Sequence, residues 1–320
     1  MSMLYLTETD VRELLPMTDA IELVEAAFER LASGAARNQP RRRLILSSGS
    51  ALHYMAASDG QYFGAKIYST NPRHGAHFLF LLYRAADAQP LALIEANHLG
   101  QIRTGAASGV ATKWMAPADA SSLAIIGTGF QACTQLEAML AVRRITEVRV
   151  WSRSAEKRNL FASEGSAKFG VAVRPVATAE EAVRGASLIV TATNAKDPVL
   201  EAEWVSPNTH INVMGSNQAS RREVPAELVK RAHWIAVDSK EQARMEAGDL
   251  ILAWEEQDWA SPRLVELQDV VSAKVQVRTN GGELTLFKSN GLAVEDVISA
   301  AFVYERAMME GRGDAVASHS

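Results

Sequence analysis

The sequence has 320 residues, 48% of them hydrophobic and 22% charged, with a formal net charge of −4. This composition is typical of a globular protein and excludes a disordered chain, and the length suggests two domains. The slight negative charge argues against a nucleic-acid partner. No apolar run approaches membrane-spanning length, and the first residues lack a signal-peptide pattern, so we expect no membrane partner. The single cysteine excludes an internal disulfide, which favours a cytoplasmic location.

The first hundred residues predict two short helices followed by an antiparallel sheet. Apolar residues at helical spacing follow residues 7–9 and again residues 17–20, and Gly34 ends the second pattern. Apolar and β-branched runs separated by turn signals then predict the strands, at residues 52–57, 62–69, 78–83 and 91–95. We expect this part of the chain to form a substrate domain.

Beyond a helix of small residues at 100–115, strands and helices alternate, which indicates a parallel sheet with helices on both faces. The expected strands are residues 123–126, 148–151, 172–175, 188–192, 210–214 and 234–237, with a returning strand at 284–288. A final helix is expected at 292–309, followed by a small, polar tail at 311–320 that we expect to fray.

This order of elements predicts an α/β protein in which a Rossmann-type parallel-sheet domain is inserted into a smaller α+β domain. The expected boundaries are 1–112 for the substrate domain and 113–288 for the dinucleotide-binding domain. Residues 289–320 are expected to form a helix that returns to the first domain.

The turn after the strand at 123–126 carries the fingerprint of a dinucleotide site. Gly127 permits a tight turn, Gly129 leaves room for a pyrophosphate, and Ala132 is small enough for close packing of helix against strand. The following helix N-terminus offers free N–H groups to phosphates. The alternative is a purely structural turn; the flanking strand and helix favour the dinucleotide.

The end of the next strand distinguishes the two nicotinamide coenzymes. An NAD site needs an acid there to bind the ribose hydroxyls, but the sequence has Ser152, Arg153 and Ser154. Arg153 can pair with a 2′-phosphate, and Ser152 and Lys157 can add donors. We therefore expect NADPH rather than NADH, against the alternative that Arg153 is an ordinary solvated charge.

A lysine and several arginines suit an anionic substrate. Lys66 lies inside an apolar, β-rich stretch, where it is either buried beside a substrate or extended to solvent from a strand edge. The run 41–43 and Arg103 supply guanidinium groups that match a carboxylate. By themselves, His53 and Asn217 are ordinary polar residues, and no spacing indicates a metal site.

Five segments resemble the ornithine cyclodeaminase/μ-crystallin family. They are GAK at 64–66, RTGAASGVAT at 103–112, GTGFQA at 127–132, GSNQASRRE at 215–223 and FKSNGLAVED at 287–296. The resemblance implies a Rossmann domain and a substrate domain that forms a homodimer through its sheet. It also implies a nicotinamide-dependent oxidoreductase acting on the carbon–nitrogen bond of a small carboxylate substrate.

The resemblance assigns roles by position. Arg42 and Arg103 match arginines that hold the substrate carboxylate, and Lys66 matches a lysine at the substrate. Arg153 matches the arginine of the NADPH-using members. The positions that match coenzyme contacts are Arg103, Thr104, Phe130, Gln131, Thr193, Val213, Met214, Gly215 and Ser289.

Two positions depart from the cyclodeaminase pattern. Cyclodeaminases carry an aspartate where this sequence has Asn217, and a glutamate where it has His53. Asparagine does not take up a proton at neutral pH, and the ketimine reductases of the family lack that acid and use NADPH. The resemblance is thus greatest to the ketimine reductase branch.

The leading hypothesis is NADPH-dependent reduction of a cyclic imine carboxylate, of the 1-pyrroline-2-carboxylate or 1-piperideine-2-carboxylate type. Lys66, or else His53, would protonate the imine nitrogen. One alternative is an ornithine or lysine cyclodeaminase, or an alanine-type amino-acid dehydrogenase. Another is a non-catalytic protein that binds NADPH and a small ligand.

Overall fold

The computed structural model describes residues 3–278 and 281–316. The chain divides into two compact units, which are considered separately. The first unit comprises Met1–Arg103 and Gly291–Ser320, and the second comprises Thr104–Asn290. The second unit is therefore continuous in sequence and interrupts the first.

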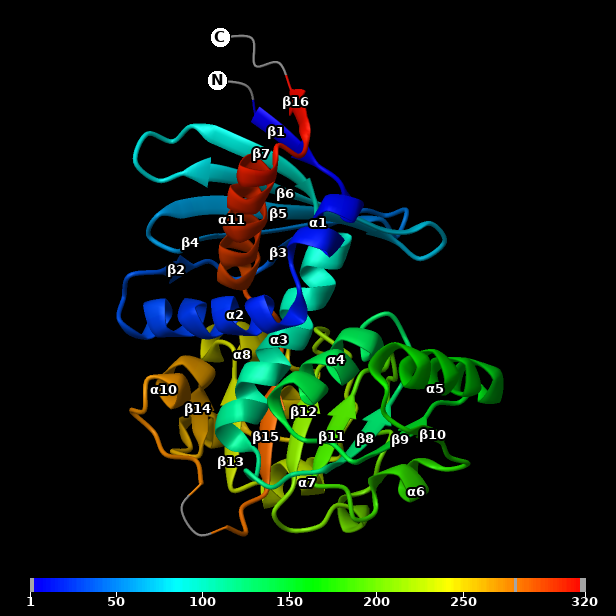
Figure 1. Cartoon of the computed structure of the whole chain (residues 1–320). Helices are drawn as coiled ribbons and strands as arrows, with labels where there is room; N and C mark the ends of the chain where they lie inside the picture. Colours follow the sequence, from blue (N-terminus) through cyan, green and yellow to red (C-terminus); the bar gives the residue numbers. More distant parts are fainter. Residues whose placement is uncertain (1–2, 279–280, 317–320) are drawn as a thin grey trace. The chain divides into compact units, whose positions relative to one another are not determined.

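The first unit is built on a sheet with the strand order β16-β1-β7-β6-β5-β4-β2, in which β3 also pairs with β4 (Figure 1). Its strands are β1 (Met3–Leu6), β2 (Arg37–Asn38), β3 (Arg42–Ile45), β4 (Ala51–Ser58), β5 (Tyr62–Asn71), β6 (Gly75–Arg84), β7 (Pro90–Glu95) and β16 (Asp314–Val316). Strands β2 to β7 pair antiparallel, as predicted.

Two details of this sheet correct the sequence-based expectations. Strand β1, which the helical pattern nearby had hidden, pairs parallel with β7, so the sheet is not purely antiparallel. The tail was expected to fray, but Asp314–Val316 forms β16 against β1. Backbone pairing holds this segment although its side chains are largely exposed. The tail residues 317–320 lie outside the described residues.

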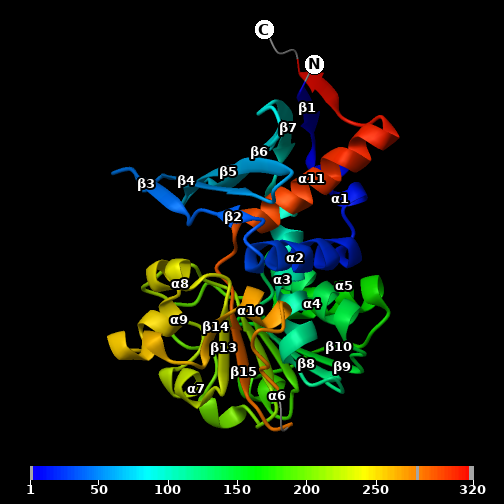
Figure 2. The same cartoon turned by 90° about the vertical axis from the view of Figure 1, so that its left-hand side faces the viewer.

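One helix crosses a face of this sheet, and two others pack against that helix. They are α1 (Glu8–Leu14), α2 (Met17–Ala32) and α11 (Ala293–Glu310), and α11 crosses β4, β5 and β6 (Figure 2). Val24 and Phe28 on the apolar side of α2 are fully buried, as the helical spacing predicts. Helix α11 is buried along most of its length, including the two acidic residues of its first turn.

The second unit contains the predicted parallel sheet, with the strand order β10-β9-β8-β11-β12-β15-β13-β14. Its strands are β8 (Ser122–Ile126), β9 (Glu147–Trp151), β10 (Val173–Pro175), β11 (Leu188–Thr191), β12 (His210–Val213), β13 (Trp234–Val237), β14 (Leu264–Glu266) and β15 (Thr285–Lys288). Every adjacent pair is parallel. The α/β class predicted from the alternation is confirmed.

Helices lie on both faces of the parallel sheet. They are α4 (Ala132–Val142), α5 (Ala155–Phe169), α6 (Ala179–Val183), α7 (Ala226–Arg231), α8 (Lys240–Glu246), α9 (Gly248–Ile251) and α10 (Leu267–Val271), with short 3₁₀ turns η1 (Ala202–Trp204) and η2 (Glu256–Ala260). Asn212 donates to Thr112 on the face of helix α3 (Asn97–Met115). Its neighbour Ile211 packs with residues of α6 to α9 on the opposite face, as alternation along a strand requires.

The strand order reverses beside β8, and this places the glycine turn. From β8 the chain moves outward to β9 and β10, then returns to β11 on the other side of β8. In open parallel sheets, ligands bind outside the carboxyl ends of the strands at such a switch point. The turn that begins at Gly127 follows β8 directly, so it lies where this topology places a dinucleotide.

Candidate functional site

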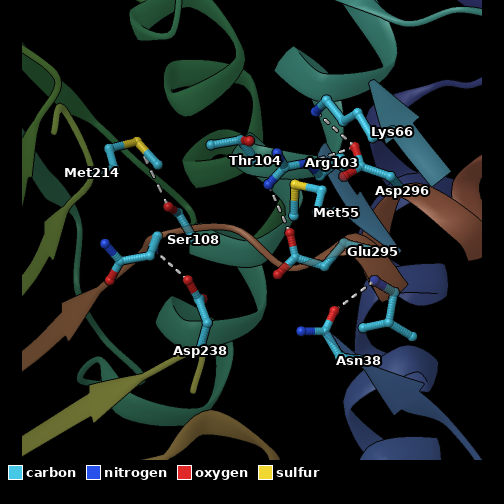
Figure 3. A network of polar contacts seen from close by, with 12 residues as sticks. Asn38, Met55, Lys66, Arg103, Thr104, Ser108, Met214, Asp238, Glu295 and Asp296 are labelled. Atoms are coloured by element: carbon cyan, nitrogen blue, oxygen red, sulfur yellow. Dashed lines mark hydrogen bonds and ion pairs between the residues drawn. The ribbon is translucent and has the colours of Figure 1, made fainter. Parts of the chain in front are cut away.

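Lys66 lies on β5 with its side chain buried. In the sheet it stands opposite Met55 on β4 and Phe80 on β6, and its side chain is only 4% exposed. Its Nζ donates to Oδ1 of Asp296 at 3.0 Å (Figure 3). A buried ammonium requires such a partner. The sequence left open whether Lys66 extends to solvent, and the structure places it in the interior.

The same carboxylate also accepts from Arg103. The Arg103 Nε donates to Asp296 Oδ1 at 3.0 Å, and its guanidinium also donates to Glu295 Oε2 at 2.9 Å. Both carboxylates lie in the first turn of α11 and are fully buried. We refer to Lys66, Arg103, Glu295 and Asp296 as the Lys66 cluster; its two cations and two anions balance.

Burial and the neighbouring charges set the protonation of this cluster. Burial lowers the pKa of Lys66 to about 8, although Asp296 acts in the opposite direction. Burial alone would raise the pKa of Asp296, but Arg103 and Lys66 hold it below its usual value. Near neutral pH the cluster therefore holds a carboxylate beside an ammonium that gives up its proton more readily than ordinary lysines.

The ammonium fits closely against the start of α3. A methyl group at residue 100 would lie 2.7 Å from the Lys66 Nζ, so a larger residue than Gly100 would displace the ammonium from this position. The small size of Gly100 thus has a physical reason, which is to leave room for a buried side chain from the sheet.

Arg42, which was predicted to bind the substrate carboxylate, lies on the exposed side of its strand. Arg42 stands opposite Tyr54 on β4, whereas Lys66 stands opposite the next residue, Met55. Because successive residues of a strand point to opposite faces, Arg42 points away from the face that carries Lys66. Its side chain is exposed.

Arg41, the residue before it, is buried. It is 6% exposed, and its guanidinium lies 3.8 Å from the Met55 Sδ, on the Lys66 face. It also contributes to lowering the pKa of Lys66. Three consecutive arginines could not be distinguished by composition, because only the packing shows that Arg41 is buried whereas Arg42 and Arg43 are exposed.

His53 lies on the Lys66 face of β4 but is not suited to donate a proton at neutral pH. Its Nε2 is 2.8 Å from Thr70 Oγ1, and its ring stacks on Tyr68 with centroids 4.4 Å apart. Burial, with Arg43 and Arg41 nearby, lowers the pKa of His53 to about 4. The imidazole is therefore neutral at pH 7, and Lys66 is the better proton donor of the two.

In the second unit the predicted coenzyme residues follow the carboxyl ends of the strands. Gly127 has a φ of 108°, and a methyl group there would lie 2.4 Å from the carbonyl oxygen of Ala192. Gly129, Phe130 and Gln131 follow it, with Phe130 52% exposed. The tight turn at Gly127 and the helix that follows fit the pyrophosphate of a dinucleotide.

The end of β9 is basic, as predicted. Ser152 accepts from the Thr128 hydroxyl at 3.1 Å, which joins the glycine turn to the β9 end. Arg153 and Lys157 are exposed there. No acidic residue stands between Trp151 and Ala155, so this end offers donors to a phosphate rather than an acceptor to ribose hydroxyls.

The remaining predicted coenzyme residues lie next to one another or on α3. Thr193 follows β11, whereas Val213, Met214 and Gly215 end β12 and begin its loop. Further predicted residues are Thr104, which is buried on α3, Ser289, which is buried after β15, and Asn217, which is half-buried in the loop after β12. The Ser289 backbone N–H donates to Val213 O at 3.0 Å, which joins the ends of β12 and β15.

Sequence reasoning missed three acidic residues and one arginine. Glu295 and Asp296 were quoted only as part of a motif, Glu223 ended another motif, and Arg41 was not separated from its neighbours. A signal for the first two was present, since adjacent acids inside an otherwise apolar helix require buried cations as partners.

Three further features of the described residues concern metals, membranes and cavities. Within 3–278 and 281–316, no group of three or more His, Cys, Asp or Glu side chains is arranged to hold a metal ion. In the same ranges no helix has the length and apolar character to cross a membrane. A cavity of about 320 Å³ lies between α2 and α11, and its arginines pair with its own acids, Arg30 with Asp59 and Arg306 with Asp19.

Comparison with known proteins identifies the family of this chain. The model of the ornithine cyclodeaminase/mu-crystallin family matches residues 1–311. Delta(1)-pyrroline-2-carboxylate reductase of Bacillus cereus is 36% identical over 98% of this chain and 99% of its own length. The match to the family model includes all five segments that suggested the resemblance.

Solved structures agree with the fold over the whole chain. Delta(1)-pyrroline-2-carboxylate reductase of Thermococcus litoralis, in complex with NADH and L-proline, has a TM-score of 0.93 and 36% identity, covering 98% of this chain and 100% of that one. An archaeal alanine dehydrogenase dimer with bound NAD has a TM-score of 0.92 and 32% identity, covering 99% of each chain.

Proposed function

Because the chain belongs to the ornithine cyclodeaminase/mu-crystallin family, we propose that it reduces a cyclic imine carboxylate with a nicotinamide coenzyme. The substrate is of the 1-pyrroline-2-carboxylate or 1-piperideine-2-carboxylate type. The observation that carries this proposal is the buried Lys66 ammonium, held 3.0 Å from Asp296. The similarity to pyrroline-2-carboxylate reductases over nearly the full length supports it.

The proposed reaction adds a hydride and a proton across a carbon–nitrogen double bond. The coenzyme, when bound, supplies the hydride to the imine carbon. Lys66 Nζ gives its proton to the imine nitrogen, so the product is the cyclic amine and the lysine is left neutral until solvent reprotonates it. Asp296 holds the ammonium in place and keeps it charged at neutral pH.

Two arginines of the first unit would bind the substrate carboxylate. Arg103 and Arg41 are both buried, and both influence the pKa of Lys66. A guanidinium suits a planar carboxylate because it offers parallel donors. Fixing the carboxylate orients the imine relative to the ammonium, and such positioning contributes about 7 kcal/mol or more to catalysis in favourable cases.

The proposed role of Asn217 is to exclude the cyclodeaminase reaction. That reaction requires proton transfers during loss of ammonia, and an amide side chain neither takes up nor releases a proton at neutral pH. Asn217 is half-buried in the loop after β12. Its replacement by aspartate is therefore the direct test of whether this position selects the reaction.

Within the nicotinamide coenzymes we favour NADPH. The residues that support it are Ser152, Arg153 and Lys157 at the end of β9, where both long basic side chains are exposed. An arginine there can pair with the 2′-phosphate of NADPH. The two solved relatives contain NADH and NAD, respectively, so both coenzymes must be compared in the assay.

The decisive assay follows coenzyme oxidation by the purified chain with 1-pyrroline-2-carboxylate or 1-piperideine-2-carboxylate. We expect turnover that yields proline or pipecolate, with higher kcat/KM for NADPH than for NADH. Ammonia release from ornithine or lysine would instead indicate a cyclodeaminase, and NAD reduction with L-alanine an alanine dehydrogenase. Saturable NADPH binding without turnover of any of these compounds would indicate a binding protein.

We further propose that the chain forms a homodimer through the open face of the first-unit sheet. Leu44, Leu52, Tyr54 and Leu79 share the face opposite to Lys66 and are each 40–57% exposed. Adjacent exposed apolar side chains on a sheet face are typical of an interface. The similar alanine dehydrogenase is a dimer, which supports a second copy of this chain as the occupant.

Light scattering after size-exclusion chromatography tests the dimer. The measured mass of the wild type should be twice that of the chain. The double variant Leu52→Glu with Leu79→Glu should have the mass of one chain. Leu160→Glu is the control, because Leu160 is also an exposed leucine, at 56%, but lies on α5 of the second unit. A monomeric wild type would exclude the proposal.

A further inference from the structure

A second buried acid, Glu223, joins two of the loops that follow the parallel strands. Its side chain is fully buried. One carboxylate oxygen accepts from the backbone N–H of Thr193 at 2.6 Å. The other accepts from the backbone N–H of Gly215 at 2.7 Å and from the Thr191 hydroxyl at 2.9 Å. A single side chain thus binds the loop after β11 and the loop after β12.

These two loops require such an acceptor because the strand pairing has ended. Strands β11 and β12 pair from Leu188 with His210 to Thr191 with Val213, so Thr193 and Gly215 lie beyond the last pair. Buried N–H groups need an acceptor, and the Glu223 carboxylate supplies it. A methyl group at residue 215 would lie 2.1 Å from Thr193 O, so glycine is needed for the loops to pack this closely.

A buried ion pair between Asp249 and Lys288 holds the backbone at Glu223 in place. Asp249 accepts from the backbone N–H groups of Glu223 and Val224, and its other oxygen lies 3.0 Å from Lys288 Nζ. Lys288 also donates to Ser216 O at 2.6 Å. We refer to Glu223, Asp249 and Lys288 as the Glu223 cluster.

The Glu223 cluster contains two carboxylates but only one ammonium. Backbone N–H groups stabilise the negative charge that the ammonium does not balance. Burial and the neighbouring Asp249 raise the pKa of Glu223, whereas Lys288 and the Thr193 hydrogen bonds oppose this rise. A carboxylate that receives two backbone N–H groups and a hydroxyl binds them more strongly than a neutral acceptor would.

We propose that Glu223 is a positioning residue that fixes the loops after β11 and β12 in the geometry that binds the coenzyme. The inference rests on the proposed function in one respect, namely that Thr193 and residues 213–215 contact the coenzyme. A loop that is already ordered loses less conformational freedom when a ligand binds. Loss of Glu223 should therefore weaken coenzyme binding and leave the chemistry in the first unit intact.

The test variant is Glu223→Gln, which keeps the shape but places an NH₂ group against one of the two backbone N–H groups. Glu227→Gln is the matched control, since Glu227 is four residues away and exposed on α7. NADPH affinity is measured by fluorescence titration of the folded proteins. We expect about 10- to 100-fold weaker NADPH binding for the variant, as loss of a charged hydrogen bond predicts, and no change for the control.

Two further readouts separate positioning from a general loss of stability. In the coenzyme-free protein, hydrogen exchange at the Thr193 and Gly215 amides should be faster in Glu223→Gln, with the centre of the sheet still protected. At saturating NADPH, kcat and the KM for the imine should stay within about threefold of wild type, because Glu223 acts only through the loops. Unchanged NADPH affinity, or unchanged exchange at both amides, would overturn the inference.

If Glu223→Gln does not fold, Glu223→Asp replaces it, since the shorter acid keeps the charge but cannot reach both loops. Weaker NADPH binding with faster exchange at one of the two amides would support the inference, and wild-type behaviour would overturn it. Failure of the proposed function is distinguishable, because a wild type that binds NADPH but reduces no imine leaves the binding and exchange experiments fully interpretable.

Discussion

The two buried polar clusters differ in what their carboxylates bind. In the Lys66 cluster, Glu295 and Asp296 bind the charged ends of two side chains, Lys66 and Arg103. In the Glu223 cluster, the two carboxylates accept mainly from backbone N–H groups, which are those of Thr193, Gly215, Glu223 and Val224. The first arrangement positions functional groups, whereas the second fixes the course of the backbone.

This difference suggests a division of roles between the two units. A side-chain ammonium held by one carboxylate can release its proton and recover it, so the Lys66 cluster suits chemistry. Backbone N–H groups do not titrate, so the Glu223 cluster suits the holding of loops. Changes in the first cluster should therefore alter turnover and its pH dependence, and changes in the second should alter coenzyme affinity.

The largest expected effect is that of Lys66→Met. Loss of a proton donor typically lowers kcat by about 10²- to 10⁴-fold, and we expect NADPH affinity to stay unchanged. Lys168→Met is the control, because Lys168 is exposed on α5. Steady-state kinetics and NADPH titration measure both quantities. A variant that keeps wild-type kcat would remove Lys66 from the chemistry and end the proposed division of roles.

A comparison of Arg41→Gln with Arg42→Gln sharpens the assignment of the carboxylate partner. Arg41 is buried on the Lys66 face and Arg42 points to the opposite one. We expect Arg41→Gln to raise the KM for the imine about 10- to 100-fold, because a charged hydrogen bond contributes about 1.5–3 kcal/mol. Arg42→Gln should change it little. The reverse order would support the assignment of Arg42 made from the sequence.

The variant Arg153→Asp tests the coenzyme preference in the second unit. An acid at the end of β9 accepts bonds from ribose hydroxyls and repels a 2′-phosphate. We expect the ratio of kcat/KM for NADPH to that for NADH to fall about tenfold or more, as the removal of one charged hydrogen bond predicts. The kcat at saturating coenzyme should not change. An unaltered ratio would show that Arg153 is a solvated surface charge.

The smallest effect we predict is a shift in the pH profile. The pKa of Lys66 is about 8 and that of His53 about 4. Since the protonated lysine is the donor, kcat/KM should be level between about pH 5.5 and 7 and fall tenfold per unit above 8. In Asp296→Asn the carboxylate that raises the lysine pKa is gone, so the decline should begin about one unit lower or more.

The pH profile also separates Lys66 from His53. Turnover that rises only below about pH 5 would point to His53 as the donor, because its pKa is lowered to about 4 by burial and by Arg43 and Arg41. A profile that is unchanged in Asp296→Asn would show that this carboxylate does not set the protonation of Lys66.

The amino-acid sequence by itself determined the class of fold and the family. Local signals were sufficient for this, because alternating strands and helices specify a parallel sheet and Gly127 marks its switch point. The final helix and the strands on either side of Lys66 were also predicted close to their observed bounds. Such elements depend on residues a few positions apart, whose periodicity is visible in the chain.

Tertiary structure decided which polar side chains meet. The register of β3 on β4 turned Arg42 away from the Lys66 face, and a shift of one residue would have turned it toward that face. Lys66 and Asp296 form a hydrogen bond although they are 230 positions apart in the sequence, and Glu223 and Thr193 do so although they are 30 positions apart. Partners so far apart leave no periodic trace in the sequence, because contact between them depends on the packing of whole elements.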